Sequence, residues 1–467
     1  MRQIFWILIA SLLICTVSEA KVIKGVVTCG ENKLSGVVVT DGKKFTQTRK
    51  DGSFRLNVGG DAKHVYIVTP SGYTADWSDG SPAFYRKVSD HSYFKFDLLS
   101  TGKSSSYNII AIGDPQPRTL EHFNEFADVP LDDIRQCASE MTSPAVGIVL
   151  GDITFDKYAL MKNWKQEIVK AGIPVYPVIG NHDHNRKIKD DDDLADDLYE
   201  EAFGPANYAF WLGNDVVVVL DNIIYDSGKK YRLGYTDETI DWVRKLMKYV
   251  PENADIYVAQ HSPLNGRHYS KMIIGHDVLL DILEGHAITF ISGHNHTNGV
   301  FEYAPGVMEH NVAAICGTWW DVYHCTDGTP RGYKVFTKED GKLTWYYKSI
   351  GKPRDFQYEV YLPGQARLHP ESVVVNVWDH DPAWTVEWYQ DGKPMGAMKQ
   401  VEEYSPIHTA DIKAKYDALG RKPSNYRLTR KAKHYFAATP SIEAKTVTFV
   451  IKDRFGNEWK EELTNIF

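Results

Sequence analysis

The chain has 467 residues, a formal net charge of -8 and a pI of about 6.1. This length predicts two to four domains, and a composition of 43% hydrophobic and 24% charged residues excludes a wholly disordered chain. A mildly acidic chain lacks the basic surface of a general nucleic-acid binder, so we expect no nucleic-acid partner.

The first 20 residues predict a cleaved secretion signal. Arg2 precedes an apolar run over residues 4–17, and Ala20 ends a small-x-small pattern typical of a signal-peptidase site. The run is too short for a comfortable membrane span, and no later segment resembles a transmembrane helix. Cys15 stands where a lipoprotein cysteine could stand, but the branched Ile14 before it disfavours lipidation. We therefore expect an exported protein, located in the periplasm, on the cell surface or outside the cell.

Residues 21–103 predict a small β-sandwich. Short β patterns, such as residues 22–27 and 36–39, are separated by turn signals, and no helical period appears. The segment resembles transthyretin-like and carboxypeptidase-regulatory-like modules.

Residues 104–358 predict a layered α/β core, because strands alternate with helices. Residues 236–250 give the clearest helix, with apolar residues on one face and Thr236 as N-cap. The acidic run at residues 189–197 is interpreted as a solvated loop and helix start rather than a metal site. Residues 359–467 return to β patterns with hairpin turns at residues 390–393 and 453–457, and they predict a C-terminal β domain.

Four cysteines remain after removal of the signal: Cys29, Cys137, Cys316 and Cys325. Export permits disulfides, and Cys316 with Cys325 is the favoured local pair. The sequence decides neither connectivity nor oxidation. No two of these cysteines have metal-ligand spacing, which argues against a thiolate zinc site.

Five short polar blocks each follow an apolar run that predicts a buried strand. The blocks are Asp114-Pro115-Gln116, Gly151-Asp152, Gly180-Asn181-His182-Asp183, Gln260-His261 and Gly293-His294-Asn295-His296. In open α/β folds, ligands bind beyond the carboxyl ends of the strands, so these blocks are expected to converge on one site. Two neighbouring divalent cations need a bridging carboxylate, further oxygen ligands and imidazoles, and the blocks supply this set.

The order and spacing of the blocks resemble the calcineurin-like metallophosphoesterases. The resemblance implies an α/β core of four layers, in which two packed β-sheets are flanked by helices, and a pair of divalent metal ions. It implies Asp114, Gln116 and His296 as ligands of the first metal. Asp152 would bridge both metals, and Asn181, His261 and His294 would bind the second.

The same resemblance gives His182 the role of general acid above the substrate phosphate, with Asp183 as its orienting partner. Residues 315–320, 327–333, 378–382 and 453–456 resemble a bacterial subfamily with extra N-terminal and C-terminal β domains. Gln116 departs from the usual Asp-x-His block. Because a glutamine carbonyl is a weaker ligand than imidazole for zinc, the first site favours a harder ion such as manganese or iron, and the choice among Mn, Fe and Zn stays open.

Loop residues beside the blocks are candidate substrate contacts, with a plain surface role as the competing interpretation. They are Arg118, His184, Asn185, Arg186, Arg267 and His268. Trp319 and Trp320 either wall the pocket or pack in the core.

Together these features predict an exported phosphohydrolase that cleaves a phosphate ester by hydroxide attack on phosphorus. Whether the ester is a monoester or a diester stays open, and no pattern indicates the oligomeric state. The alternative is a surface protein that binds a glycan or another protein and keeps a metal-stabilised, catalytically weak core. A nuclease of the same superfamily is disfavoured by the acidic charge and by export.

Overall fold

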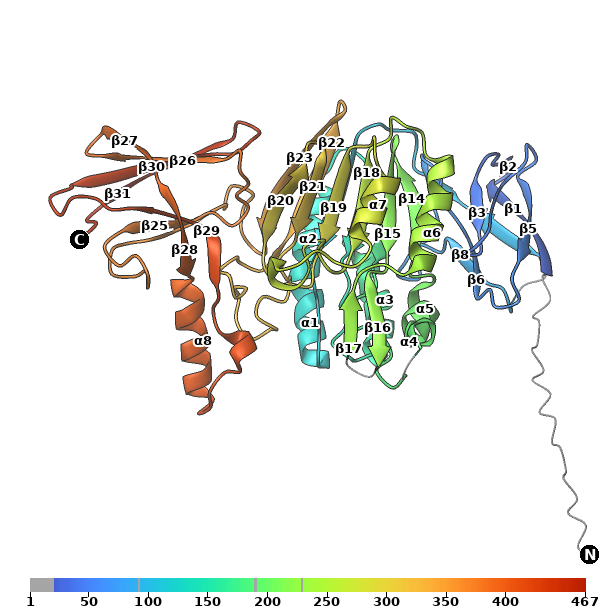
Figure 1. Cartoon of the computed structure of the whole chain (residues 1–467), viewed down its shortest axis with the longest axis horizontal. Helices are drawn as coiled ribbons and strands as arrows, with labels where there is room; N and C mark the ends of the chain where they lie inside the picture. The colour runs from blue at the N-terminus through green and yellow to red at the C-terminus, as the bar shows by residue number, and fades with distance from the viewer. Residues whose placement is uncertain (1–20, 91–92, 189–190, 228–229) are drawn as a thin grey trace, which may run out of the picture.

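The computed structural model describes residues 21–90, 93–188, 191–227 and 230–467. The predicted signal at residues 1–20 lies outside them. In the described part, β-rich regions lie at both ends of a central α/β body (Figure 1). Within these residues, no helix has the length and apolar character needed to cross a membrane. The domain boundaries at residues 20, 103 and 358 stay predictions.

The N-terminal region is built from two four-stranded sheets and one short strand pair. In the first sheet β5 and β2 flank β1, and β9 runs parallel to β1. Its strands are β1 (Lys21–Cys29), β2 (Asn32–Lys33), β5 (Ser53–Val58) and β9 (Phe94–Asp97). The second has the order β4-β3-β6-β8, with β3 (Val38–Thr40), β4 (Phe45–Gln47), β6 (His64–Ile67) and β8 (Tyr85–Lys87). The pair is β7 (Tyr73–Thr74) and β10 (Leu99–Ser100).

Two sheets form the central body. The first has the order β13-β12-β11-β22-β23, made of β11 (Tyr107–Ile112), β12 (Ala145–Val149), β13 (Val175–Pro177), β22 (Gly332–Glu339) and β23 (Lys342–Ser349). The second has the order β14-β15-β18-β19-β21-β20, made of β14 (Tyr208–Leu212), β15 (Asp215–Leu220), β18 (Ile256–Gln260), β19 (Ile288–Ser292), β20 (Gly299–Ala304) and β21 (Val307–Asn311). A separate hairpin joins β16 (Ile223–Ser227) to β17 (Lys230–Leu233).

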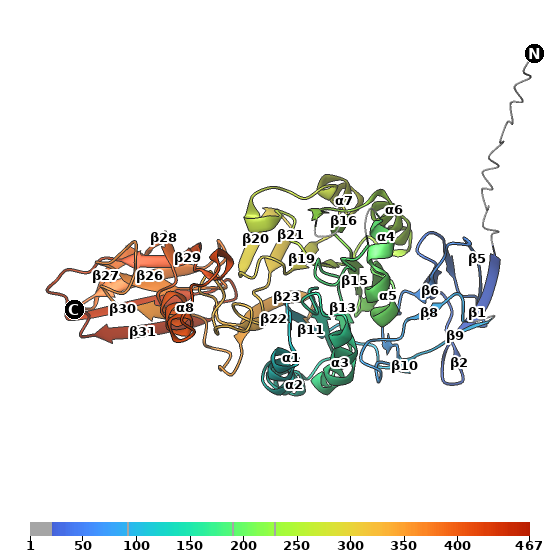
Figure 2. The ribbon, with the colours of Figure 1, turned by 90° about the horizontal axis from the view of Figure 1, so that it is seen from below.

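Helices cover the outer faces of the two central sheets (Figure 2). On the first sheet these are α1 (Leu120–Asp128), α2 (Pro130–Ser139) and α3 (Ala159–Ile168), followed by η1 (Val169–Ala171). On the second they are α6 (Asp237–Leu246), η2 (Met247–Tyr249) and α7 (His276–Ile282). The remaining short elements of the body are α4 (Asp192–Ala195), α5 (Asp197–Phe203) and η3 (Arg267–Tyr269).

The two faces of β11 explain the layering. Ile109 and Ala111 pack in the core shared with the second sheet, whereas Ile110 and Ile112 pack against α1 to α3. Side chains of a strand point alternately to opposite faces, so a continuous apolar run can bury both of them. This confirms the predicted core of two packed sheets flanked by helices.

Two further four-stranded sheets form the C-terminal region. Their orders are β24-β25-β29-β28 and β27-β26-β30-β31. The strands are β24 (Glu359–Tyr361), β25 (Val373–Asn376), β26 (Thr385–Gln390), β27 (Lys393–Ala397), β28 (Lys399–Tyr404), β29 (Lys431–Ala438), β30 (Thr446–Lys452) and β31 (Glu458–Thr464). Between β28 and β29 the chain forms α8 (Pro406–Ala418) and η4 (Asn425–Arg427), which the sequence analysis did not predict.

The described cysteines correct one expectation. Cys29, Cys137, Cys316 and Cys325 are free thiols, so the favoured Cys316–Cys325 disulfide is not formed. Cys316 Sγ instead donates to the carbonyl oxygen of Gly317, and Cys325 Sγ donates to that of Ala314.

Candidate metal centre

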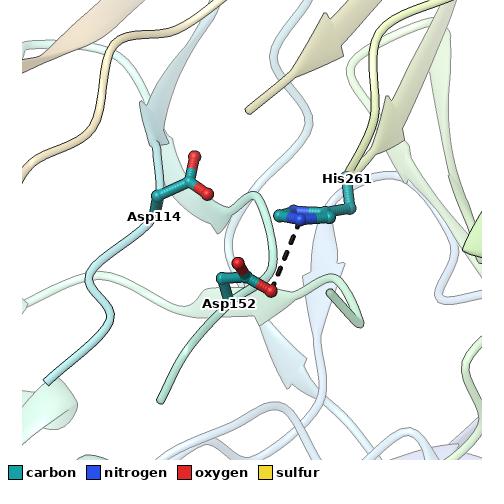
Figure 3. Close-up of side chains that lie close together, drawn as sticks. All are labelled: Asp114, Asp152 and His261. Atoms are coloured by element: carbon teal, nitrogen blue, oxygen red, sulfur yellow. Dashed lines mark ion pairs between the residues drawn. The ribbon is translucent and has the colours of Figure 1, made fainter. Parts of the chain in front are cut away.

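The predicted ligand blocks lie where parallel strands end. In the first sheet β11, β12 and β13 are parallel, and in the second β15, β18 and β19 are parallel. Because parallel strands end at the same edge of a sheet, the blocks that follow them meet there. Figure 3 shows Asp114, Asp152 and His261 pointing toward one another, and their ligand atoms lie within 4.8 Å of one another.

Several predicted ligands have a left-handed backbone conformation. Positive φ angles occur at five of the predicted ligands: Asp114, Gln116, Asp152, His294 and His296. Such a conformation costs about 1–3 kcal/mol at a non-glycine residue and persists where the surrounding structure enforces it, often at a functional site.

The glycines that begin two of the blocks are required by close packing. A Cβ atom at Gly151 would lie 2.6 Å from His261 Nδ1, and one at Gly293 would lie 2.5 Å from Asp114 Oδ2. Both distances are shorter than real carbon contacts, so a side chain here would displace a predicted ligand.

The first group of predicted ligands is Asp114, Gln116 and His296, beside Asp152. His296 Nε2 lies 3.4 Å from Asp114 Oδ1, and the Gln116 amide donates to Asp152 Oδ2. Asp114 Oδ1 and Gln116 Oε1 are buried and have no hydrogen-bond partner in the described part of the chain.

The second group gathers around His261. Its Nε2 lies 3.1 Å from Asn181 Oδ1, 3.1 Å from His294 Nδ1 and 3.4 Å from Asp152 Oδ1. His261 Nδ1 lies 2.7 Å from the carbonyl oxygen of Leu150 and donates its N–H there, which leaves the Nε2 lone pair facing the site. Asp152 therefore contacts both groups, and its role as a bridge stays a prediction.

Buried polar atoms without hydrogen-bond partners indicate whether the site has room and ligands for two metal ions. Besides Asp114 Oδ1 and Gln116 Oε1, His294 Nε2 is buried without a hydrogen-bond partner. Such atoms cost about 1–3 kcal/mol each when nothing satisfies them. Carboxylate, amide and imidazole donors suit Mn, Fe or Zn, so the residues present fit two divalent cations.

The electrostatics of the site favour an ionised bridge and a neutral histidine. Burial alone would raise the pKa of Asp152, but nearby His261 and His182 lower it to about 2. Burial and the neighbouring His261 hold the pKa of His294 well below its usual range. Metal binding requires a deprotonated carboxylate and a neutral imidazole, and both groups meet this need.

His182 faces the site, but its partner differs from the predicted one. Its Nε2 lies 4.0 Å from Asp152 Oδ2, and its Nδ1 lies 2.9 Å from Asp156 Oδ1 and 2.7 Å from Arg186 Nη2. Asp183 points away and accepts the backbone N–H groups of Gly180, Ile153 and Thr154. Asp156 therefore contacts His182 in the place predicted for Asp183.

Two of the candidate substrate contacts, Arg118 and Arg186, lie close to His182. Arg118 lies near the site, with its guanidinium 3.8 Å from the ring of Phe155, which itself stacks on His182 at 3.8 Å. The Nε atom of Arg118 is buried without a hydrogen-bond partner in the described residues. Arg186 contacts His182 directly, as described above, and donates to Asp156 Oδ2 at 2.7 Å.

His268 lies on the neighbouring loop. Its backbone N–H donates to Asn295 Oδ1, and its ring lies 2.8 Å from Arg430 Nη1. Arg267, beside it, is exposed. Asn185 lies on another loop, where its backbone N–H donates to the Ala195 carbonyl. His184, in contrast, is fully buried, and its Nδ1 contacts the Gly180 carbonyl. The structure therefore removes His184 from the candidate substrate contacts.

Residues that follow the last block in the sequence lie beside His296 and the first block. The ring of Trp319 lies 4.8 Å from that of His296, and Trp320 donates from Nε1 to the Pro115 carbonyl. Arg427 of η4 lies 5.6 Å from the Trp319 ring and donates to Asp321. Neither Arg427 nor Asp156 carries a sequence signal, because Arg427 lies in the short helix η4 and Asp156 in a loop, and neither segment has a recognisable block.

Three family models match the chain. They are described as the N-terminal part of the calcineurin-like phosphoesterases (residues 21–101), the calcineurin-like phosphoesterase itself (residues 107–298) and its C-terminal part (residues 309–459). No curated protein gives a significant match.

Similar solved structures include a dimetal phosphatase from Danio rerio, with 14% identity and a TM-score of 0.38, covering 52% of this chain and 96% of that one. Another is a purple acid phosphatase from yellow lupin seeds, with 11% identity and a TM-score of 0.38, covering 68% and 67%. A third is a phosphopantetheinyl hydrolase from Mycobacterium tuberculosis, with 13% identity and a TM-score of 0.31, covering 45% and 90%.

Proposed function

The chain belongs to the calcineurin-like phosphoesterases, hydrolases of phosphoric ester bonds, and on this premise we propose that it is an exported dimetal phosphohydrolase. The observation that carries the proposal is the meeting of all five predicted blocks at the strand ends of the two central sheets, with buried ligand atoms left unpartnered. Export rests on the N-terminal sequence pattern, and fractionation of cells that express the full chain tests it.

Each predicted ligand keeps its role in the proposal. Asp114, Gln116 and His296 would hold one cation, Asn181, His261 and His294 would hold the other, and Asp152 would bridge them. When bound, the two cations would lower the pKa of a water molecule and neutralise phosphate oxygens. Asp152 remains ionised for this task because His261 and His182 lower its pKa.

His182 serves as the general acid. Its Nε2 faces the site and would give a proton to the leaving oxygen, whereas Nδ1 is held by Asp156 and Arg186. Phe155 stacks on the imidazole and limits its rotation. Asp156 thus acts as a positioning residue, because it touches His182 and not the reacting phosphate.

Arginines from two parts of the chain would bind the phosphate oxygens. Arg118 lies beside the first block and has an unpartnered buried Nε. Arg427 comes from the C-terminal region and is held by Asp321 beside Trp319. Guanidinium groups bind phosphate with two parallel hydrogen bonds, so both are suited to an anionic ester.

The decisive experiment compares p-nitrophenyl phosphate with bis-p-nitrophenyl phosphate. The mature protein is stripped of metal and reloaded with manganese, iron or zinc. We expect turnover of at least one ester to return with metal and to vanish in Asp152→Asn, and the preferred ester then defines a monoesterase or a diesterase. Absence of both turnover and stoichiometric metal would favour a binding protein instead. Cleavage of DNA or RNA with manganese would favour the nuclease.

A further inference from the structure

A second cluster of metal-ligand side chains lies outside the predicted pair. It consists of His184, Asp196 and Asp221, whose ligand atoms lie within 4.8 Å of one another. His184 follows the block after β13, Asp196 lies between α4 and α5, and Asp221 directly follows β15. Their exposed fractions are 0%, 9% and 9%, so three separate segments direct polar groups into one buried place.

The orientation of His184 leaves one ring nitrogen free for a ligand. Its Nδ1 lies 2.9 Å from the Gly180 carbonyl and donates its N–H to that oxygen. A backbone carbonyl in this position is a common outer partner of a metal-binding histidine, because it fixes the tautomer and turns the Nε2 lone pair outward.

The contacts of Nε2 do not satisfy it. His184 Nε2 lies 3.0 Å from Asp196 Oδ1 and 3.9 Å from Asp221 Oδ2. In the described part of the chain, neither His184 Nε2 nor Asp196 Oδ1 has a partner with hydrogen-bond geometry. Buried polar atoms in native proteins are nearly always satisfied, so this pair points to a further atom between them.

Charge supports a cation at this place. The strongest electrostatic partners of Asp221 are Asp196, His184 and Asp192, and none is lysine or arginine. Although burial opposes it, the neighbouring Asp196 raises the pKa of His184 to about 10, so without a cation a protonated His184 pairs with Asp196 and neutralises only one of the two carboxylates of the cluster. One divalent cation with a neutral His184 would neutralise both, and burial makes an uncompensated carboxylate costly.

We propose that His184, Asp196 and Asp221 bind a third divalent metal ion, separate from the predicted pair. One imidazole nitrogen and two carboxylate oxygens suit Zn²⁺ or Mn²⁺, whereas Ca²⁺ takes six to eight oxygen ligands. The ion would tie the loop that carries Asn181 and His182 to the end of β15 and to the α4–α5 junction. This site does not depend on the proposed function.

The test counts metal ions in the full chain. After reloading with Mn²⁺ or Zn²⁺ and removal of the excess, we expect three ions per wild-type chain and two in Asp221→Asn. The matched control is Asp215→Asn, at the other end of β15, because Asp215 is buried and accepts from Tyr107 at 2.5 Å. This control is expected to keep three ions.

Equal metal counts in wild type and Asp221→Asn would overturn the proposal, and the cluster would then be a proton-held ion pair. If the chain does not bind the predicted metal pair, wild type should hold one ion and Asp221→Asn none. The metal count therefore distinguishes failure of the proposed function from failure of this proposal. A second measurement does not depend on folding of a variant. Anomalous X-ray scattering from metal-loaded wild-type crystals should give a peak among the three side chains, and no peak there would also overturn the proposal.

Discussion

His182 and Asp156 allow the general-acid step to be tested at the level of single residues. A general acid matters most when the leaving oxygen is basic, because a poor leaving group needs the proton in the transition state. We expect His182→Gln to lose about 10²–10⁴-fold in kcat on an alkyl phosphate and much less on p-nitrophenyl phosphate. Metal content should not change.

Asp156→Asn should also lower kcat more on the alkyl phosphate than on p-nitrophenyl phosphate. The loss should be smaller than in His182→Gln, because the substitution releases the His182 ring without removing it. The matched control is Asp132→Asn, since Asp132 is half-buried on α2 and its side chain pairs with Arg135 and Gln136 of the same helix. Steady-state kinetics on the two esters and metal analysis of each variant check this prediction. An equal loss on both esters would remove His182 from proton transfer.

The sequence predicts which residues gather at the site, but it does not predict the residues that support them. Each ligand sits in a short block after an apolar run, so its position follows from strand periodicity and strand ends. The family resemblance implies Asp183 as the partner of His182, whereas the carboxylate of Asp183 accepts three backbone N–H groups of the turn. Asp156 could not be found, because its contact with His182 depends on how two loops meet in space.

At the level of elements, the strands were easier to predict than α8. Apolar runs at residues 109–112, 146–150, 256–259 and 288–291 mark β11, β12, β18 and β19. The structure extends β11 by two residues and β18 and β19 by one each, and it shifts β12 by one residue. The helix α8 had usable start signals, since Ser405 accepts from His408 N–H at 3.2 Å and Pro406 occupies the first turn. Its buried side chains are His408, Ile412 and Tyr416, so the apolar stripe that normally indicates a helix is missing.

Strand β21 carries a buried acid that makes stability depend on pH. Glu309 accepts from Leu264 N–H at 2.9 Å and from Ser292 Oγ at 3.0 Å, and thereby joins the loop after β18 to the end of β19. Burial raises the pKa of Glu309 to about 7 from an ordinary value of 4.5. The folded state therefore holds this proton more tightly than the unfolded state does.

Because the folded pKa is raised, this contribution to the free energy of unfolding is complete below pH 4.5 and is lost as pH rises through 7. The loss is on the order of 3 kcal/mol at most. Glu309→Gln cannot ionise, so we expect its stability to fall less than that of wild type between pH 5 and pH 8. Denaturant unfolding with a chelator present, which removes the effect of metal loading, measures the difference. Parallel pH profiles would contradict the assignment.

At the level of the whole molecule, the C-terminal region is joined to the metal loop through buried polar contacts. Asn298, two residues after His296, donates to the Trp378 carbonyl at 2.8 Å and to Asp379 Oδ1 at 2.9 Å. Asp379 also pairs with Lys334 of β22 at 2.6 Å, and both side chains are almost fully buried. Such contacts hold the C-terminal region in one orientation, which lets η4 place Arg427 beside Trp319. No sequence pattern indicates this, since it depends on how two distant parts of the chain pack against each other.

Arg427 tests whether the C-terminal region takes part in substrate binding. We expect Arg427→Ala to raise KM for a phosphate ester about tenfold or more and to change kcat little, because a charge-assisted hydrogen bond to phosphate contributes about 1.5–3 kcal/mol. The matched control is Arg367→Ala, since Arg367 belongs to the same region but is exposed and stacks on Tyr404 at 4.6 Å. The increase in KM should also shrink at high salt, because ions screen the contact. Unchanged KM in Arg427→Ala would restrict substrate binding to the central body, and the arginine would then serve only to hold Asp321.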